Sequence, residues 1–285
     1  MAGGSETSRL KHLYDQVRSA FFIAPDLDEL FALGDSRSAR FEPAAAACWS
    51  RFRSRIVGLI AALEVPYELA HAGVMDRLYQ QFADPAMAAP ALFADDPTTE
   101  AGAARLERAR RDARHKVEEF RSATIGRNHI VESIGVFLMR ATAEAPFAAS
   151  ARQLLLQGTV LCWAAYEGLA SDCAVHALDG RPLPDPDAIA AAYAALAPDR
   201  ALLRQALEAA DLRLLFARQR TICRGATIDA EYAASAQLSA DAIGTPLRVP
   251  PAELQAHLRS VIAAAIEIVD AVDRHARSQP PTVLS

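Results

Sequence analysis

Apolar residues recur with the period of an α-helix along most of the chain, and this pattern limits the accessible folds more than any other feature. Similar apolar stripes occupy residues 44–63, 66–82, 100–143, 147–178, 187–216 and 254–272. Pro250, Pro251 and Glu253 are typical of the first turn of the last of these helices. No segment alternates apolar and polar residues for long enough to indicate a strand. The sequence therefore predicts an all-α protein made of helical bundles.

Segments rich in proline, glycine and aspartate divide this helical pattern. They lie at residues 84–98, around Pro146 and at residues 180–186. A chain of 285 residues with 52% hydrophobic residues is long enough for two medium-sized domains. We predict a helical domain of unknown role over residues 1–146, a second domain over 147–278 and a disordered tail over 279–285. Alternatively, the long segment 100–143 packs across both halves.

Charge and cysteine content exclude several classes of protein. The net charge of −5 gives no overall attraction to nucleic acid, so an RNA contact requires a local basic patch. The four cysteines show no CxxC spacing, which predicts reduced thiols in a cytoplasmic protein, with no metal site and no cofactor. The N-terminus has no apolar core of a signal peptide, and the uncharged segment 153–166 is too short to cross a membrane.

Residues 218–232, which read RQRTICRGATIDAEY, carry the most specific motif. This segment resembles the functional signature of the HEPN superfamily, in which an Arg is followed five positions later by a His. Arg218 is in place here, whereas Cys223 occupies the position of the His. Two further pieces resemble prokaryotic HEPN domains of the RiboL-PSP type. These are the apolar helix that carries Tyr166 and Glu167, and the segment from Ile243, which resembles the family's Gly-containing turn, extended segment and final helix.

The resemblance implies a helical bundle that works on RNA in a prokaryotic toxin–antitoxin or antiphage system. Active HEPN ribonucleases cleave RNA without a metal ion: the Arg stabilises charge on the phosphorane and the His transfers protons. On this basis Arg218 grips the phosphate, Cys223 stands in for the base and Glu167 orients the Arg. Two chains usually pair so that both motifs line one cleft. We therefore expect a homodimer in which helix 147–178 and segment 216–224 of both chains meet.

Each of these assignments has a simpler alternative. A thiolate at Cys223 would be an anion beside an anionic phosphate and a poor general acid, so Cys223 is alternatively a small packing residue in a disabled site. Glu167 is alternatively a surface or cap-pairing residue. Four arginines lie close together in this segment: Arg213, Arg218, Arg220 and Arg224. They predict contacts with a phosphate backbone. Alternatively, they form a solvated helix face and pair with Asp211 and Glu208.

A literal Arg-x4-His motif occurs elsewhere, at Arg110 and His115. It lies within a uniformly charged segment whose i, i+4 charge pairs favour an exposed helix rather than an active site. Two functions follow from the sequence. The first is a ribonuclease-superfamily protein that binds RNA and either cleaves it or has lost cleavage. The second is a non-catalytic HEPN scaffold that assembles with a partner protein from the same operon.

Overall fold

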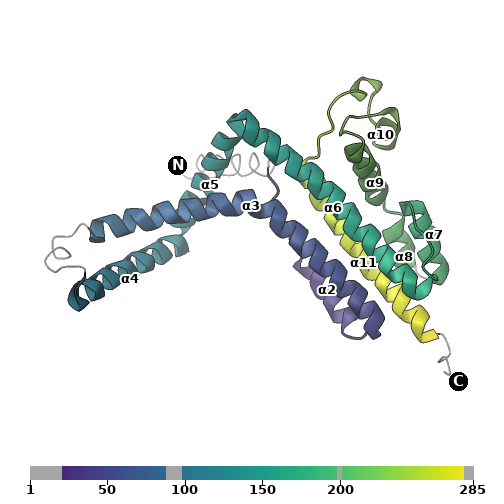
Figure 1. Ribbon diagram of the computed structural model, residues 1–285, viewed down its shortest axis with the longest axis horizontal. Helices are drawn as coiled ribbons and strands as arrows, with labels where there is room; N and C mark the ends of the chain where they lie inside the picture. Colours follow the sequence, from purple (N-terminus) through teal and green to yellow (C-terminus); the bar gives the residue numbers. More distant parts are fainter. Residues whose placement is uncertain (1–20, 88–97, 198–200, 279–285) are drawn as a thin grey trace, which may run out of the picture. The chain divides into compact units, whose positions relative to one another are not determined.

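The computed structural model describes residues 21–87, 98–197 and 201–278, and these are almost entirely helical (Figure 1). Within them no β-strand forms, and the sole β-feature is an isolated antiparallel bridge between Thr227 and Pro246. The all-α prediction is confirmed. The tail predicted over 279–285 lies outside the described residues.

The chain divides into two compact units that are not consecutive in sequence. One unit contains residues 22–64 and 149–285, and the other contains residues 1–21 and 65–148. The predicted boundary at residue 147 is close to the junction at 148/149. However, residues 22–64 belong with the C-terminal half, because their apolar side chains share its core.

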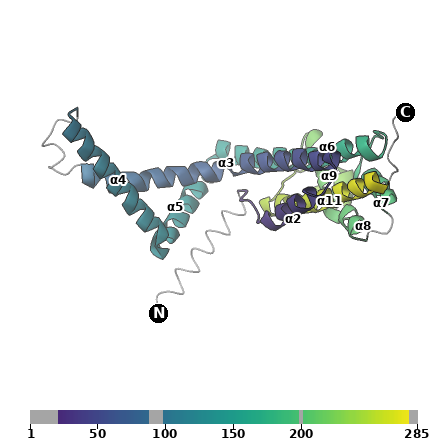
Figure 2. The same cartoon turned by 90° about the horizontal axis from the view of Figure 1, so that it is seen from below.

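The unit formed by residues 22–64 and 149–285, called here the C-terminal unit, is built on long helices. The helices α2 (Asp28–Ser38), the first half of α3 (Pro43–Met87), α6 (Ala145–Ala177) and α11 (Pro251–Ser278) form one side. Helices α7 (Pro186–Leu196), α8 (Ala201–Leu207), α9 (Ala210–Cys223) and α10 (Ala230–Ser235) complete it, with a 3-10 turn at Ala240–Ala242. Helices α6 and α11 run side by side in both views (Figures 1 and 2).

The core of this unit follows the predicted stripes. Leu254, Leu258, Val261 and Ile262 of α11 are fully buried, together with Phe52 of α3 and Trp163 and Tyr166 of α6. Gly158 lets α6 approach its neighbours, because a Cβ there would lie 2.7 Å from a methyl group of Leu63 and 3.1 Å from one of Leu254. Burial of these large side chains accounts for the stability of the unit.

The other unit contains a helical hairpin. Helices α4 (Glu100–Ser122) and α5 (Thr124–Ala143) replace the single helix predicted over 100–143. Ala123 is extended, with φ −73° and ψ 145°, and therefore breaks the helix between them. A Cβ at Gly126 would lie 1.7 Å from the carbonyl oxygen of Phe120, so this tight connection requires glycine.

Two other predicted boundaries differ in the structure. Helix α3 continues through Pro66, although a proline inside a helix lacks the backbone donor and its ring crowds the carbonyl of the preceding turn. The segment 187–216 forms three helices instead of one. Within α3, residues 43–82 are long and apolar enough to cross a membrane, a property shared with core helices of soluble proteins and with signal sequences.

Candidate functional site

The Arg218–Tyr232 signature forms the end of α9, a turn and α10. After Cys223, the last residue of α9, the chain turns through Gly225 and Ala226, whose φ angles are 113° and 55°. The following segment pairs with the extended residues after Gly244: Ile228 N–H donates to Thr245, and Leu247 N–H donates to Ala226. The turn, extended segment and last helix noted in the sequence therefore pack directly against the signature.

Arg218 is buried, with 5% of its surface exposed, and its guanidinium is engaged inside the C-terminal unit. Its Nε donates to Tyr232 Oη at 2.9 Å, and its Nη1 donates to His257 Nε2 at 2.7 Å. Its Nη2 forms an ion pair with Glu253. Tyr232 lies on α10, and both other partners lie on α11. Arg218 therefore fastens the end of α9 to two other helices.

His257 is the residue of this cluster that local sequence spacing does not reveal. It is 1% exposed and accepts a hydrogen bond from Arg218 through Nε2, so its proton resides on Nδ1 and the ring is neutral. Nδ1 has no hydrogen-bond partner among the described residues. Burial, followed by the Arg218 charge, lowers the pKa of His257 from 6.5 to about 4, against a small opposing effect of Asp211.

Cys223 lies on a different side of α9 from Arg218. Five residues along an α-helix correspond to a rotation that leaves the two side chains about 140° apart. Arg218 points into the unit, whereas Cys223 is exposed and accepts a hydrogen bond from Gln219 at 3.4 Å. The structure therefore does not bring the predicted base and the predicted phosphate-gripping group together. The alternative of a packing residue also differs from the structure, because Cys223 is exposed.

Glu167, predicted to orient Arg218, is half-buried on α6 and has no hydrogen bond or ion pair with the described residues. The carboxylate beside Arg218 is that of Glu253, in the first turn of α11. Because this contact joins residues 35 positions apart, the spacing of the signature alone did not indicate it.

The other three predicted RNA-binding residues, Arg213, Arg220 and Arg224, share the exposed face of α9 and its end. Their seven- and four-residue spacing places them on one helical stripe. Each has an acidic partner: Arg213 pairs with Asp187 at 2.9 Å, Arg220 with Glu231 at 2.7 Å, and Arg224 with Glu231 at 3.0 Å and Asp229 at 3.5 Å. Three arginines thus face three carboxylates, which leaves little net positive charge.

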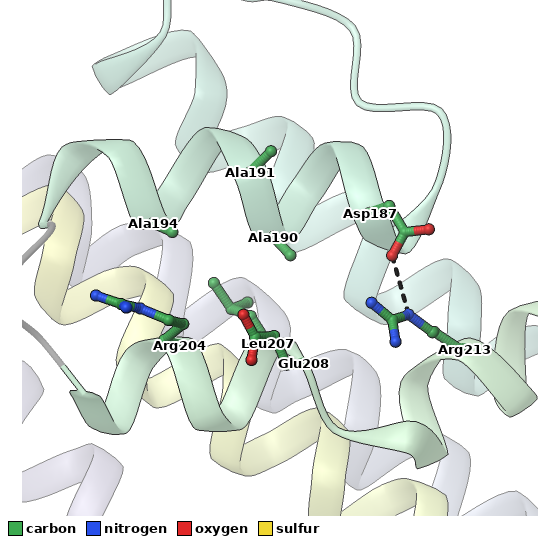
Figure 3. A pocket seen from close by; sticks show the side chains of 8 residues that line it. All are labelled: Asp187, Ala190, Ala191, Ala194, Arg204, Leu207, Glu208 and Arg213. Carbon is green, nitrogen blue, oxygen red and sulfur yellow. Dashed lines mark hydrogen bonds and ion pairs between the residues drawn. The ribbon is translucent and has the colours of Figure 1, made fainter.

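The predicted pairing of this face with Asp211 and Glu208 is wrong for Asp211, which accepts a hydrogen bond from Ser260 at 3.0 Å. Glu208 and Arg213 instead line a cavity of about 260 Å³ between α7 and α8. Figure 3 shows Arg204 and Glu208 on one wall, with three alanines of α7 opposite. The Asp187–Arg213 ion pair lies at one end of this cavity (Figure 3).

Arg110 and His115 lie on the charged helix α4. Arg110 contacts Glu107 at 3.6 Å, and His115 contacts Glu119 at 3.4 Å. Their side chains are 45% and 73% exposed, so both are ordinary members of a solvated helix face.

Among the described residues, no group of three or more His, Cys, Asp or Glu side chains is placed to hold a metal ion. Comparisons of the chain with family models, curated proteins and solved structures found no match.

Proposed function

We propose that the C-terminal unit is a non-catalytic HEPN-like interaction module that assembles with a second copy of itself. The observation that carries this proposal is the burial of Arg218 against Tyr232, His257 and Glu253. A guanidinium that grips a phosphate has to present free N–H groups to it. Here its donors are directed at groups of the same chain.

Removing Arg218 from this cluster to meet RNA would carry a large energetic cost. Breaking a buried ion pair or charged hydrogen bond costs about 3–5 kcal/mol, because the remaining partners lose their compensation. A thiol on another face of the helix cannot complete the site. Metal-free RNA cleavage requires a free cation and a base at the same phosphate. This geometry provides neither.

Binding of RNA without cleavage is the competing function. Arg213, Arg220 and Arg224 form the surface that would contact a phosphate backbone. Their ion pairs are exposed, and exposed pairs contribute only about 0–1 kcal/mol, so RNA phosphates can in principle replace the carboxylates. The three matching carboxylates nevertheless cancel the local field that would attract RNA, and this favours the interaction module.

The proposed assembly surface is the outward face of α6. Residues spaced three and four apart form one uncharged stripe along it, called here the α6 stripe: Gln157, Leu161, Ala164, Gly168, Ser171 and Val175. Leu161 and Val175 are 53% and 66% exposed, although they are large and apolar. Alternating spacings of three and four are those of helices that pack along one another.

The size pattern of the α6 stripe fits a second copy of the same helix. In an antiparallel pair around a twofold axis level with Tyr166, Ala164 lies opposite Gly168. In the same register Leu161 lies opposite Ser171, so a large side chain meets a small one. The guanidinium of Arg55 from α3 covers Gly168 and lies 3.8 Å from Asp172, so one charged pair lies on the α6 stripe at this point. Such an isologous pair closes as a dimer.

The resemblance to HEPN proteins supplies the proposed setting. It implies a cytoplasmic prokaryotic defence or toxin–antitoxin system and a partner protein from the same operon. The dimer presents two C-terminal units, and therefore two equivalent surfaces, to such a partner.

Light scattering on the full chain tests the assembly surface. We expect the wild type to be a dimer at micromolar concentration and Leu161→Glu to be a monomer with the same helix content. Leu202→Glu is the matched control, because Leu202 is 62% exposed on α8, away from the α6 stripe. A wild-type monomer, or equal effects of both substitutions, would remove the α6 stripe from the proposal.

RNA assays test the loss of catalysis independently. With EDTA present, we expect no RNA cleavage by the wild type and none by Cys223→His, because residue 223 lies apart from Arg218. Salt-dependent RNA binding that is lost in Arg220→Ala would favour the competing function. Metal-independent cleavage that Cys223→Ser abolishes would refute the non-catalytic assignment.

A further inference from the structure

A pair of buried cysteines joins the first half of α3 to α6. Cys48 on α3 and Cys173 on α6 both have no exposed surface and belong to the same core of the C-terminal unit. The two thiols lie close enough for each to shift the pKa of the other. Because the residues are 125 positions apart in the chain, only the packing of the two helices brings them into contact.

A charged group lies directly on this pair. Arg51, one turn after Cys48, places Nη2 3.5 Å from Cys48 Sγ, while its Nε donates to Asp172 at 3.1 Å. Asp172 precedes Cys173 on α6. The Arg51 and Asp172 side chains are 48% and 30% exposed, so this ion pair extends from the solvent to the buried sulfurs.

The surroundings distinguish the two sulfurs. The hydrogen bond from Cys173 lowers the pKa of Cys48, and the Arg51 guanidinium helps, although burial and Asp172 oppose them. The pKa of Cys173 is raised well above its usual range by the hydrogen bond to Cys48 and by burial. Cys48 is therefore the better nucleophile and Cys173 the thiol that remains protonated.

The other two cysteines lack this arrangement. Cys162 is buried without a charged neighbour, and burial raises its pKa to about 12. Cys223 is exposed and has Gln219 as its partner. These residues provide an unreactive buried reference and an accessible single thiol.

We propose that Cys48 and Cys173 form a reversible redox pair that hydrogen peroxide oxidises to a disulfide. Peroxide reaches the pair when the exposed Arg51–Asp172 ion pair parts. The Cys48 thiolate attacks one peroxide oxygen: an S–O bond forms, the O–O bond breaks and hydroxide leaves as water after taking up a proton. The Cys173 sulfur then attacks the resulting sulfenic acid, forming the S–S bond and releasing a second water. Two thiols and one peroxide thus yield one disulfide and two waters.

Oxidation would increase the stability of the C-terminal unit. A disulfide between residues 48 and 173 closes a loop that contains the whole of segment 65–148. A link across a long loop restricts the unfolded chain and so favours the folded state. Peroxide would therefore fix α3 onto α6, and thiol reductants would release it.

The test uses the full-length Cys223→Ser protein, which removes the exposed thiol. After treatment with limiting hydrogen peroxide, iodoacetamide alkylation and digestion without reductant, mass spectrometry should find the Cys48 and Cys173 peptides joined, with the loss of two hydrogen masses. Dithiothreitol should separate them. Cys162 is fully buried, so it should stay reduced and should not react with iodoacetamide while the protein is folded. Its labelling therefore reports on global unfolding.

Single variants test the order of events. In Cys173→Ser, Cys48 should accumulate as a sulfenic acid that dimedone labels, whereas in Cys48→Ser residue 173 should stay unlabelled. Arg51→Ala should slow disulfide formation about tenfold, because a neighbouring cation increases the thiolate population. Labelling of Cys162 at the rate of disulfide formation, or the absence of a 48–173 link at peroxide doses that oxidise Cys223 in the wild type, would overturn the proposal.

Discussion

Stability of the C-terminal unit should depend on pH through His257. The pKa of His257 is about 4 in the folded protein and 6.5 in the reference state, so the unfolded chain binds the proton more tightly. Between these values the unfolded state carries more protons, and the free energy of unfolding must fall as the pH falls. The contribution of His257 is fully present above pH 6.5 and is lost by about pH 4.

The size of this effect follows from the pKa difference. One pKa unit corresponds to about 1.4 kcal/mol, so the change from 6.5 to about 4 amounts to about 3 kcal/mol. The free energy of unfolding of a domain is typically about 5–15 kcal/mol, or about 0.1 kcal/mol per residue. The contribution of His257 is a large part of that. Burial of the ring is the main cause of this shift, the Arg218 charge adds to it, and Asp211 opposes both.

Urea unfolding of the wild type and of His257→Gln, followed by circular dichroism at several pH values, measures the effect. The carboxylates titrate in both proteins, so they cancel in the difference of unfolding free energies. We expect wild type to exceed the variant by about 3 kcal/mol more at pH 7 than at pH 4. A difference that stays constant with pH would refute the neutral, buried His257. An NMR titration in which the His257 ring protonates near pH 6.5 would refute it as well.

Further predictions concern stability and domain boundaries. Arg218→Ala should lower the free energy of unfolding by about 3 kcal/mol, whereas Arg220→Ala should change it by less than about 1 kcal/mol; denaturant unfolding compares them. Gly126→Ala should destabilise the α4–α5 hairpin, because the added methyl group would clash with the Phe120 carbonyl. Gly73→Ala on α3 is the matched control: its methyl group would meet no atom within 4 Å, so it should raise the melting temperature slightly. A fragment of residues 147–285 should lack cooperative thermal unfolding, and restored cooperativity in that fragment would contradict the discontinuous unit.

Much of the fold was predictable from local patterns. The α11 stripe predicts both the helix and its buried residues, because a helix packed along one side repeats its apolar positions every three or four residues. The division of segment 100–143 was not predictable in this way. Ala123 and Gly126 break the helix through the packing of two helices, and neither residue type by itself marks a helix end as clearly as proline does.

The contacts of Arg218 were not predictable from the sequence. Arg218 was identified from its spacing to Cys223, yet its contacts are with Tyr232, Glu253 and His257, which lie 14 or more positions away. His257 occupies a position on the buried side of an amphipathic helix, where its imidazole looks like one more core residue in the sequence. The role of a polar residue in such a place depends on what the other helices bring to it.

The discontinuous unit has a consequence for synthesis on the ribosome. The residues of α3 that fill its core, including Phe52 and Trp49, are made long before their partners on α6 and α11. Residues 65–148 emerge in between, and they include the α4–α5 hairpin, whose two helices are adjacent in the chain and contact each other. Residues 65–148 should therefore fold first, whereas the apolar side of α3 stays uncovered until α11 has been synthesised. During that interval the nascent protein exposes an apolar helix, and chaperone binding should concentrate there.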